Sequence, residues 1–418
     1  MRRFALAVFA TFGVVFSAAA APPPAGYSAK VTVAGPTRLD WTFVVSNRST
    51  VDPPADMLGK DYDSAKQTYE LFVPARKDAK KPAPAILFIS ASDEPAGWKA
   101  FETLCKDKGI VFIGVRSAGN NVPGPKRIRI ILDCLDDVRR QIPLDPDRTY
   151  VSGFSGGARI ACGLAFALPE QFGGIIPLCA GGDLRDEQWL RFLATDRLSV
   201  ALVTGETDFN RGEVERWKGP MWKELGFRVK VWTQAKLGHA IPSAATLAEA
   251  VAWLDEAADA RATLAKKSPL SRATPESVPS RADAATAILK EGQGLLEVRA
   301  TQYRGLMLVK GTSERWPDTD AGKAARTLLL SYEAKKERPW EAEDVAELRR
   351  QFTAEARSLG DYALNGIPAG SQYEKQRPDM ARKAIDLWAA LIADAPESDL
   401  AKEAKKKVAE LELLTKKK

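Results

Sequence analysis

Histidine is almost missing from this chain, since His239 is the only one among 418 residues. Zinc sites in proteins are built mainly from histidine and cysteine. There are four cysteines, Cys105, Cys134, Cys162 and Cys179, and no two of them have the C-x-x-C spacing of a metal site. We therefore expect no bound metal, and any chemistry that needs an imidazole has to use His239.

Several other binding signals are also missing. No stretch has the glycine spacing of a phosphate loop or of a dinucleotide-binding turn, so we expect no cofactor. The net charge is +7, but acidic residues are interspersed almost throughout the chain. Such mixing is typical of a solvated surface rather than of a face that binds nucleic acid. We therefore expect no nucleic-acid partner.

The one long apolar run lies at the N-terminus. Two arginines at positions 2–3 precede an apolar stretch over residues 4–16, and small residues follow to position 21. This pattern predicts a cleavable signal peptide over residues 1–21 and a secreted or periplasmic protein. The run is too short to cross a membrane, and no later stretch qualifies. An oxidising compartment permits disulfides, and free buried thiols stay open as the alternative.

The feature that is present is the pentapeptide Gly153-Phe154-Ser155-Gly156-Gly157, which reads G-x-S-x-G. A β-prone run precedes it and a helical run follows it, so the serine is expected on a sharp strand-to-helix turn. Glycines tolerate such a turn because they carry no side chain. The turn exposes the Ser155 hydroxyl and places the Gly156 amide at a helix N-terminus, facing a developing oxyanion.

Short apolar runs alternate with helical patterns on both sides of this turn. Continuous apolar runs of this kind are typical of buried parallel strands, and the alternation predicts an α/β fold with helices on both faces of a mostly parallel sheet. The predicted strands are residues 30–33, 41–45, 67–73, 84–90, 110–115, 148–152, 174–179, 200–204 and 228–232.

The chain is predicted to form two domains. The sheet unit covers residues 27–262, and a stretch rich in proline and serine, residues 263–282, is predicted to be a mobile linker. Residues 283–418 show only helical periodicity. Within them Pro317–Lys323 matches Pro396–Lys402, each opening a helix after an acidic cap. This weak repeat resembles tetratricopeptide-type hairpins, with an unrelated helical bundle as the alternative, and suits a scaffold for a protein partner.

A serine hydroxyl needs a base to become a nucleophile, and the base needs an acid to hold its tautomer. His239 follows the last predicted strand, at the sheet edge that also presents Ser155, and is the base by position. The acid is expected after the preceding strand, where Asp208 is our choice. Glu206 is the near competitor and Asp183 the distant one. For each of these residues, an ordinary structural role is the alternative.

Residues 68–257 resemble the α/β-hydrolase superfamily, and within it the secreted polyhydroxybutyrate depolymerase and feruloyl esterase type. The segments that carry this are residues 147–157, 205–208 and 238–242. The chain order Ser155, Asp208, His239 is the order of that fold. The resemblance implies a serine esterase, and it does not extend to the helical region.

One departure from the superfamily concerns the loop after the third strand. That loop usually carries His-Gly, whose backbone gives a second hydrogen bond to the oxyanion, and here it reads Ser90-Ala91-Ser92. The amides of Ala91 and Ser92 are the expected donors beside Gly156. Alanine makes a positive φ unfavourable, and loss of one donor lowers the rate by about 10²–10³.

The interval from residue 180 to residue 199 has room for only one short helix, so we expect an open site, which suits a bulky or polymeric ester. The partner is thus an ester substrate, with its size, small or polymeric, left open. The substrate classes are an acylated polysaccharide, a phenolic ester or a polyester. Trp98, Trp189, Trp217 and Trp222 are candidates to line it, although ordinary packing is the favoured interpretation of each. The sequence thus favours a secreted serine carboxylic-ester hydrolase. The alternatives are a non-catalytic binding or scaffold protein, favoured by the altered oxyanion loop, and a serine peptidase.

Overall fold

The computed structural model describes residues 23–46, 49, 53–54, 56–274, 277–338, 340–371 and 373–416. The predicted signal peptide, residues 1–21, therefore lies outside the described residues. Within them, no helix has the length and apolar character needed to cross a membrane.

A single sheet of eight strands organises the fold, in the order β1-β2-β4-β3-β5-β6-β7-β8. β1 and β2 pair antiparallel, as do β2 and β4, and the other neighbours are parallel. The strands are β1 (Gly26–Thr32), β2 (Thr68–Val73), β3 (Ala83–Ile89), β4 (Val111–Val115), β5 (Leu144–Phe154), β6 (Gly174–Leu178), β7 (Ser199–Gly205) and β8 (Arg228–Gln234). This confirms the predicted α/β class with a mostly parallel sheet.

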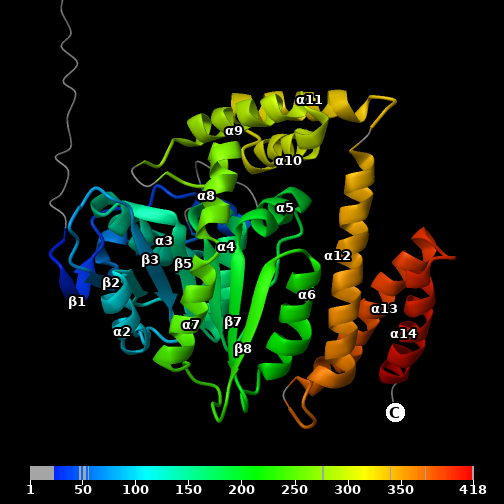
Figure 1. Cartoon of the computed structure of the whole chain (residues 1–418), viewed down its shortest axis with the longest axis horizontal. Helices are drawn as coiled ribbons and strands as arrows, with labels where there is room; N and C mark the ends of the chain where they lie inside the picture. Colours follow the sequence, from blue (N-terminus) through cyan, green and yellow to red (C-terminus); the bar gives the residue numbers. More distant parts are fainter. Residues whose placement is uncertain are drawn as a thin grey trace, which may run out of the picture.

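Helices and shorter turns connect and cover the strands (Figure 1). The α-helices are α1 (Trp41–Ser46), α2 (Trp98–Lys108), α3 (Gly124–Gln141), α4 (Gly156–Ala167), α5 (Gln188–Arg197), α6 (Gly219–Glu224), α7 (Ala244–Asp255), α8 (Ala258–Lys267), α9 (Arg281–Leu296), α10 (Arg299–Arg315), α11 (Asp320–Glu333), α12 (Glu341–Asp361), α13 (Arg377–Asp394) and α14 (Asp399–Thr415). Short 3₁₀ or π turns are η1 (Ser64–Lys66), η2 (Pro169–Gln171), η3 (Glu213–Lys218), η4 (Pro269–Ser271), η5 (Tyr362–Gly366) and η6 (Glu374–Gln376).

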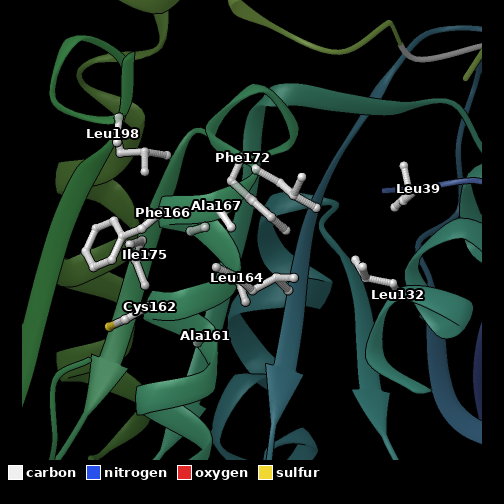
Figure 2. Packing of buried hydrophobic residues seen from close by; sticks show 14 of the residues in the cluster. Leu39, Leu132, Ala161, Cys162, Leu164, Phe166, Ala167, Phe172, Ile175 and Leu198 are labelled. Atoms are coloured by element: carbon white, nitrogen blue, oxygen red, sulfur yellow. The ribbon is translucent and has the colours of Figure 1, made fainter. Parts of the chain in front are cut away.

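Both faces of the sheet are buried. Because successive side chains on a strand point to opposite faces, Ile86 and Phe88 pack against α2 and α7, whereas Leu87 and Ile89 belong to the larger core under the helices of the other face. Figure 2 shows part of that larger core, which contains Leu164 and Phe166 of α4 and Ile175 of β6. Burial on both faces explains why the central strands are apolar throughout.

The predicted edge strand over residues 41–45 is wrong, since this segment forms helix α1. Its aromatic and β-branched residues favour strands, but tertiary contacts override that preference. The preceding backbone crosses α3, where the amides of Ala34, Thr37 and Arg38 donate to aspartate carboxylates of that helix at 2.7–2.8 Å. The chain is thereby held over α3 and away from the sheet edge.

The helical region, residues 281–416, occupies two sides of the sheet unit (Figure 1). α9, α10 and α11 lie across the end of the sheet where the parallel strands begin, and α12 then runs beside α6, with the α13–α14 hairpin on its outer side. The predicted repeat corresponds to matching helix starts, because Thr319 and Ser398 cap α11 and α14 by accepting from the amides of Gly322 and Ala401. Helices α10 and α11 bury their apolar residues in the larger core, whereas α13 and α14 bury theirs in a separate cluster. Stacked repeats would share one core.

The stretch predicted to be a mobile linker contacts the sheet unit in its described part. Ser268 is 1% exposed, Arg272 pairs with Asp147 at 2.5 Å, and the Ala273 amide donates to the Glu170 carbonyl at 2.6 Å. Proline and serine make a segment poor in apolar contacts, but here ion pairs and backbone hydrogen bonds hold it. These contacts depend on residues more than 100 positions away, so local composition could not predict them.

The larger core also crosses the predicted domain boundary. Leu289, Leu306 and Trp316 of the helical region belong to the same buried cluster as the sheet unit. Trp189 of α5 is 3% exposed and donates through Nε1 to Glu314 at 2.6 Å. By contrast, the cluster around Trp388 contains only residues of α12–α14 and the turns between them.

Two truncated chains test the predicted boundary. A chain ending at Lys267 exposes the apolar face around Trp189, and each large apolar side chain contributes about 1.5–3 kcal/mol when buried. We expect this chain to lose cooperative thermal unfolding, because the loss approaches the about 5–15 kcal/mol of a native fold.

A chain ending at Lys336 keeps α9–α11 and is the matched comparison. We expect it to unfold cooperatively at a reduced Tm, measured by circular dichroism. If the chain ending at Lys267 unfolds cooperatively at the Tm of the full chain, residues 27–262 form the independent domain that the sequence predicts.

Candidate active site

Ser155 stands at a strained turn at the carboxyl end of β5. Its φ is 56° and its ψ −118°, and its amide donates to the Leu178 carbonyl at the end of β6, 2.9 Å away. Positive φ is unfavourable for a residue with a side chain. Helix α4 begins at the next residue. This is the strand-turn-helix that the G-x-S-x-G motif predicts.

The glycines of the motif are required by close backbone contacts. A Cβ added at Gly153 would lie 2.3 Å from the Gly157 carbonyl oxygen, and one added at Gly157 would lie 2.1 Å from the Ile89 carbonyl oxygen. Neither contact can relax without moving a backbone segment. The turn is therefore packed directly against the end of β3.

The structure brings the three predicted side chains into one hydrogen-bonded chain. His239 Nε2 lies 2.9 Å from Ser155 Oγ, and His239 Nδ1 lies 2.8 Å from Asp208 Oδ1. The Asp208 side chain is fully buried, whereas that of His239 is 18% exposed. A carboxylate on Nδ1 fixes the tautomer in which Nε2 accepts a proton.

Two further donors hold the Asp208 carboxylate, and a thiol lies beside it. Thr204 Oγ1 donates to Oδ2 at 2.7 Å, and the Asn210 amide donates to Oδ1 at 3.0 Å. The Cys179 thiol lies next to it, and burial together with the Asp208 charge raises the pKa of Cys179 to about 12. The carboxylate therefore has two hydrogen-bond donors in addition to His239. The supporting residues Thr204, Asn210 and Cys179 were not identified from the sequence, although Thr204 and Asn210 lie within four positions of Asp208.

The two competing carboxylates have other partners. Glu206 is exposed and accepts from the Lys236 amide at 2.8 Å. Asp183 forms an ion pair with Lys218, and its side chain is 84% exposed. Neither contacts His239 in the described structure, so Asp208 is the carboxylate that the geometry selects.

Cys179, Asp208 and His239 also offer ligand atoms within 4.8 Å of one another. These three side chains already have partners within the protein. Cys179 Sγ donates to the Ala240 carbonyl at 3.3 Å, and Asp208 and His239 already bond each other. These atoms fit a hydrogen-bonded support for the acid better than a metal centre.

The three predicted oxyanion donors differ in whether their backbone amides already have a hydrogen-bond acceptor. The Gly156 amide is at the first position of α4 and has no carbonyl one turn above it. Among the described residues the Ala91 amide donates to no backbone carbonyl, and it lacks the positive φ that would strain an alanine. The Ser92 amide donates to Ser90 Oγ at 3.1 Å. The geometry favours Gly156 and Ala91 and leaves Ser92 engaged elsewhere.

The aromatic side chains beside His239 are phenylalanines, which the sequence analysis did not select. The Phe209 ring stacks on the imidazole with 4.0 Å between centroids and is 51% exposed, and Phe154 lies 4.9 Å away. Their positions in the sequence could have identified both residues, since Phe154 is inside the motif and Phe209 follows Asp208.

The four tryptophans proposed as cleft residues pack elsewhere. Trp98 stacks on Tyr27, and Trp217 stacks on Tyr362. Trp189 and Trp222 are buried, at 3% and 0% exposed. Ordinary packing therefore accounts for all four.

The helical region reaches the loop that follows Asp208. The Tyr373 hydroxyl donates to Asn210 Oδ1 at 3.1 Å, and Asn210 Nδ2 donates to the Cys179 carbonyl at 2.9 Å. A Cβ at Gly212 would lie 2.1 Å from the Gly366 carbonyl oxygen, so the two backbones touch. The helical region is therefore in direct contact with the loop that follows Asp208.

This contact can be measured through stability. Tyr373→Phe leaves Asn210 Oδ1, in a side chain only 3% exposed, without its donor. We expect the free energy of unfolding to fall by about 1–3 kcal/mol. Tyr332→Phe is the matched control, because the Tyr332 hydroxyl forms no described hydrogen bond, and we expect a change within about 0.5 kcal/mol. Equal effects in urea titrations would show that the Tyr373 contact is absent in solution.

Comparisons with known proteins give similarity at the level of structure. No protein-family model and no curated protein matches the sequence. Among solved structures, S-formylglutathione hydrolase (FrmB) from Staphylococcus aureus is 14% identical with a TM-score of 0.36, the alignment covering 45% of this chain and 92% of that one. Est1E from Butyrivibrio proteoclasticus is 15% identical with a TM-score of 0.37, covering 48% and 97%. Esterase PE8 is 20% identical with a TM-score of 0.34, covering 44% and 96%.

The fold itself rests on features of this chain. The strand order is crossed between β3 and β4, the nucleophile candidate stands on a strained turn between β5 and α4, and the residues bonded to it follow β7 and β8. The order serine, aspartate, histidine along the chain is the one found in this architecture. The chain has the fold of the α/β-hydrolase superfamily.

Proposed function

We propose that this protein is a serine carboxylic-ester hydrolase. The observation that carries the proposal is the hydrogen-bonded chain from Ser155 through His239 to the buried Asp208, at a turn that holds Ser155 in a strained conformation. Such an arrangement turns a weakly nucleophilic hydroxyl into an effective one.

In the proposed reaction, Ser155 Oγ attacks the ester carbonyl carbon while its proton passes to His239 Nε2. The imidazolium that forms is stabilised by Asp208 on Nδ1. The carbonyl oxygen becomes an oxyanion facing the Gly156 and Ala91 amides, where preorganised donors lower the barrier. His239 then protonates the departing alcohol, and the acyl group stays on Ser155. Water repeats the sequence in the second half and releases the acid.

The proposed substrate is a bulky or polymeric ester. Support comes from Phe209, which is 51% exposed beside His239 and presents an apolar ring to a bound acyl or alcohol group. Helix α5, the only α-helix between β6 and β7, packs against α10 rather than over Ser155. The predicted signal peptide supports a secreted or periplasmic location, where polyesters and acylated polysaccharides are met.

The serine is tested by replacement and by covalent labelling. We expect the full chain to hydrolyse a p-nitrophenyl ester and to be labelled by a fluorophosphonate. Ser155→Ala should abolish labelling and lower kcat by about 10⁶-fold, because nucleophile and base act as a unit. Ser331→Ala, at an exposed serine of α11, is the control and should label normally. An unlabelled wild type would favour the non-catalytic binding protein instead.

The choice of acid is tested by a pair of isosteric replacements. Asp208→Asn removes the charge that holds the His239 tautomer, and we expect kcat to fall by about 10⁴-fold. Glu206→Gln should change kcat less than about twofold, since Glu206 is exposed and bonded to the Lys236 amide. The reverse ranking in steady-state kinetics would assign the acid to Glu206.

A further inference from the structure

The side chain of Asn120 lies directly against the nucleophile turn. A Cβ added at Gly156 would lie 2.0 Å from Asn120 Oδ1 and 2.7 Å from Asn120 Nδ2. The carboxamide therefore covers the α-carbon of the residue whose amide is the first oxyanion donor. Because a Cβ lies about 2.5 Å from its own backbone nitrogen, Asn120 Nδ2 is within about 5 Å of the Gly156 nitrogen. Two donors at this separation can both reach one oxygen atom at hydrogen-bond distance.

A buried arginine fixes which way the carboxamide points. Arg127 Nη1 donates to Asn120 Oδ1 at 3.2 Å, and Nη2 donates to the Ser90 carbonyl at 2.9 Å. A guanidinium only donates, so the carboxamide atom that it contacts is the oxygen. Nδ2 is then the free end, and no described group accepts a hydrogen bond from it. Asn120 is exposed, so this donor is open to a bound molecule.

The same segment is tied to the loop after β3. The Asn120 amide donates to the Ala91 carbonyl at 2.9 Å. The two expected backbone donors, Gly156 and Ala91, are thus both in contact with Asn120. The loop after β3 lacks the His-Gly that is usual in the superfamily, and the Asn120 side chain lies where it can supply a donor in its place.

Arg127 is a charged residue that is buried beside Asn120. It is 5% exposed, its Nε has no partner, and no carboxylate of the described chain forms an ion pair with it. Burial lowers the pKa of Arg127 to about 10, so the guanidinium stays charged at neutral pH. The Asp93 carboxylate acts on this guanidinium through its charge but forms no direct ion pair with it. A buried charge without a direct ion pair is destabilising, whereas a fixed positive charge near developing negative charge lowers a barrier.

We propose that Asn120 Nδ2 is a side-chain donor to the oxyanion, acting with the Gly156 amide, and that Arg127 is the positioning residue that holds its carboxamide in the donating orientation. The proposal rests on the proposed ester hydrolysis. In the ground state the donor faces a neutral carbonyl oxygen. In the tetrahedral intermediate it faces an oxyanion, and the hydrogen bond becomes charge-assisted and stronger.

The decisive variant is Asn120→Asp. It keeps the shape of the side chain and lets a carboxylate pair with Arg127, so we expect an unchanged or higher Tm. It removes the donor and places negative charge beside the oxyanion. We expect kcat for a p-nitrophenyl ester and the rate of fluorophosphonate labelling to fall by about 10²–10³, with KM altered less than about threefold. Asn120→Ala removes the donor without adding charge, so it should also lower kcat, by no more than Asn120→Asp does.

Asn121→Asp is the matched control, because it makes the same charge change at the next exposed position. We expect labelling at the wild-type rate. If the wild type labels and Asn120→Asp labels as fast, the Asn120 assignment is overturned and the proposed function stands. If the wild type neither labels nor turns over, the proposed function fails and the oxyanion role fails with it.

Arg127 is tested by Arg127→Met and Arg127→Lys. A positioning role predicts that kcat falls in Arg127→Met with KM nearly unchanged, and that Arg127→Lys, which keeps a donor and the charge, recovers at least about tenfold of the loss. A purely structural role predicts instead that both variants lower Tm and that their kcat, measured on the folded fraction, equals that of the wild type.

Discussion

The close contact between the Ser155 turn and the end of β3 is the constraint on which the site depends. Gly157 approaches the Ile89 carbonyl so closely that no side chain fits between them. This contact holds Ser155 at a φ of 56° and brings its turn beside the loop that starts at Ser90. The proposed nucleophile and the proposed oxyanion donors are therefore positioned by the same backbone packing. Rigid strands supply that packing, which is why the strain can persist.

Local sequence patterns correctly predicted the elements that depend on residues close together in the sequence. The apolar runs over 84–90 and 110–115 became β3 and β4, and the G-x-S-x-G motif became the strained turn. His239 could be assigned to Ser155 because the chain contains no other histidine, and Asp208 followed from its place after β7. The sequence could therefore bring these three residues together on chain order alone, although their catalytic roles remain predictions.

The features that the sequence could not predict all depend on contacts between distant segments. The run over 41–45 has strand-forming residues, but α3 carboxylates hold the preceding backbone and α1 forms instead. Arg127 reads as an ordinary helix residue, and only the fold places it against Asn120 and the Ser90 carbonyl. The stretch after Lys267 has the composition of a linker, yet Arg272 is paired with Asp147.

One long helix, α12, connects the two places where the helical region contacts the sheet unit. α9–α11 cover the end of the sheet where the parallel strands begin, and Tyr373 contacts Asn210 at the end where they finish (Figure 1). α12 spans the distance between them with 21 residues, or about 30 Å at the rise of an α-helix. One continuous helix therefore connects the core that the helical region shares with the sheet unit to the segment that contacts the loop after Asp208.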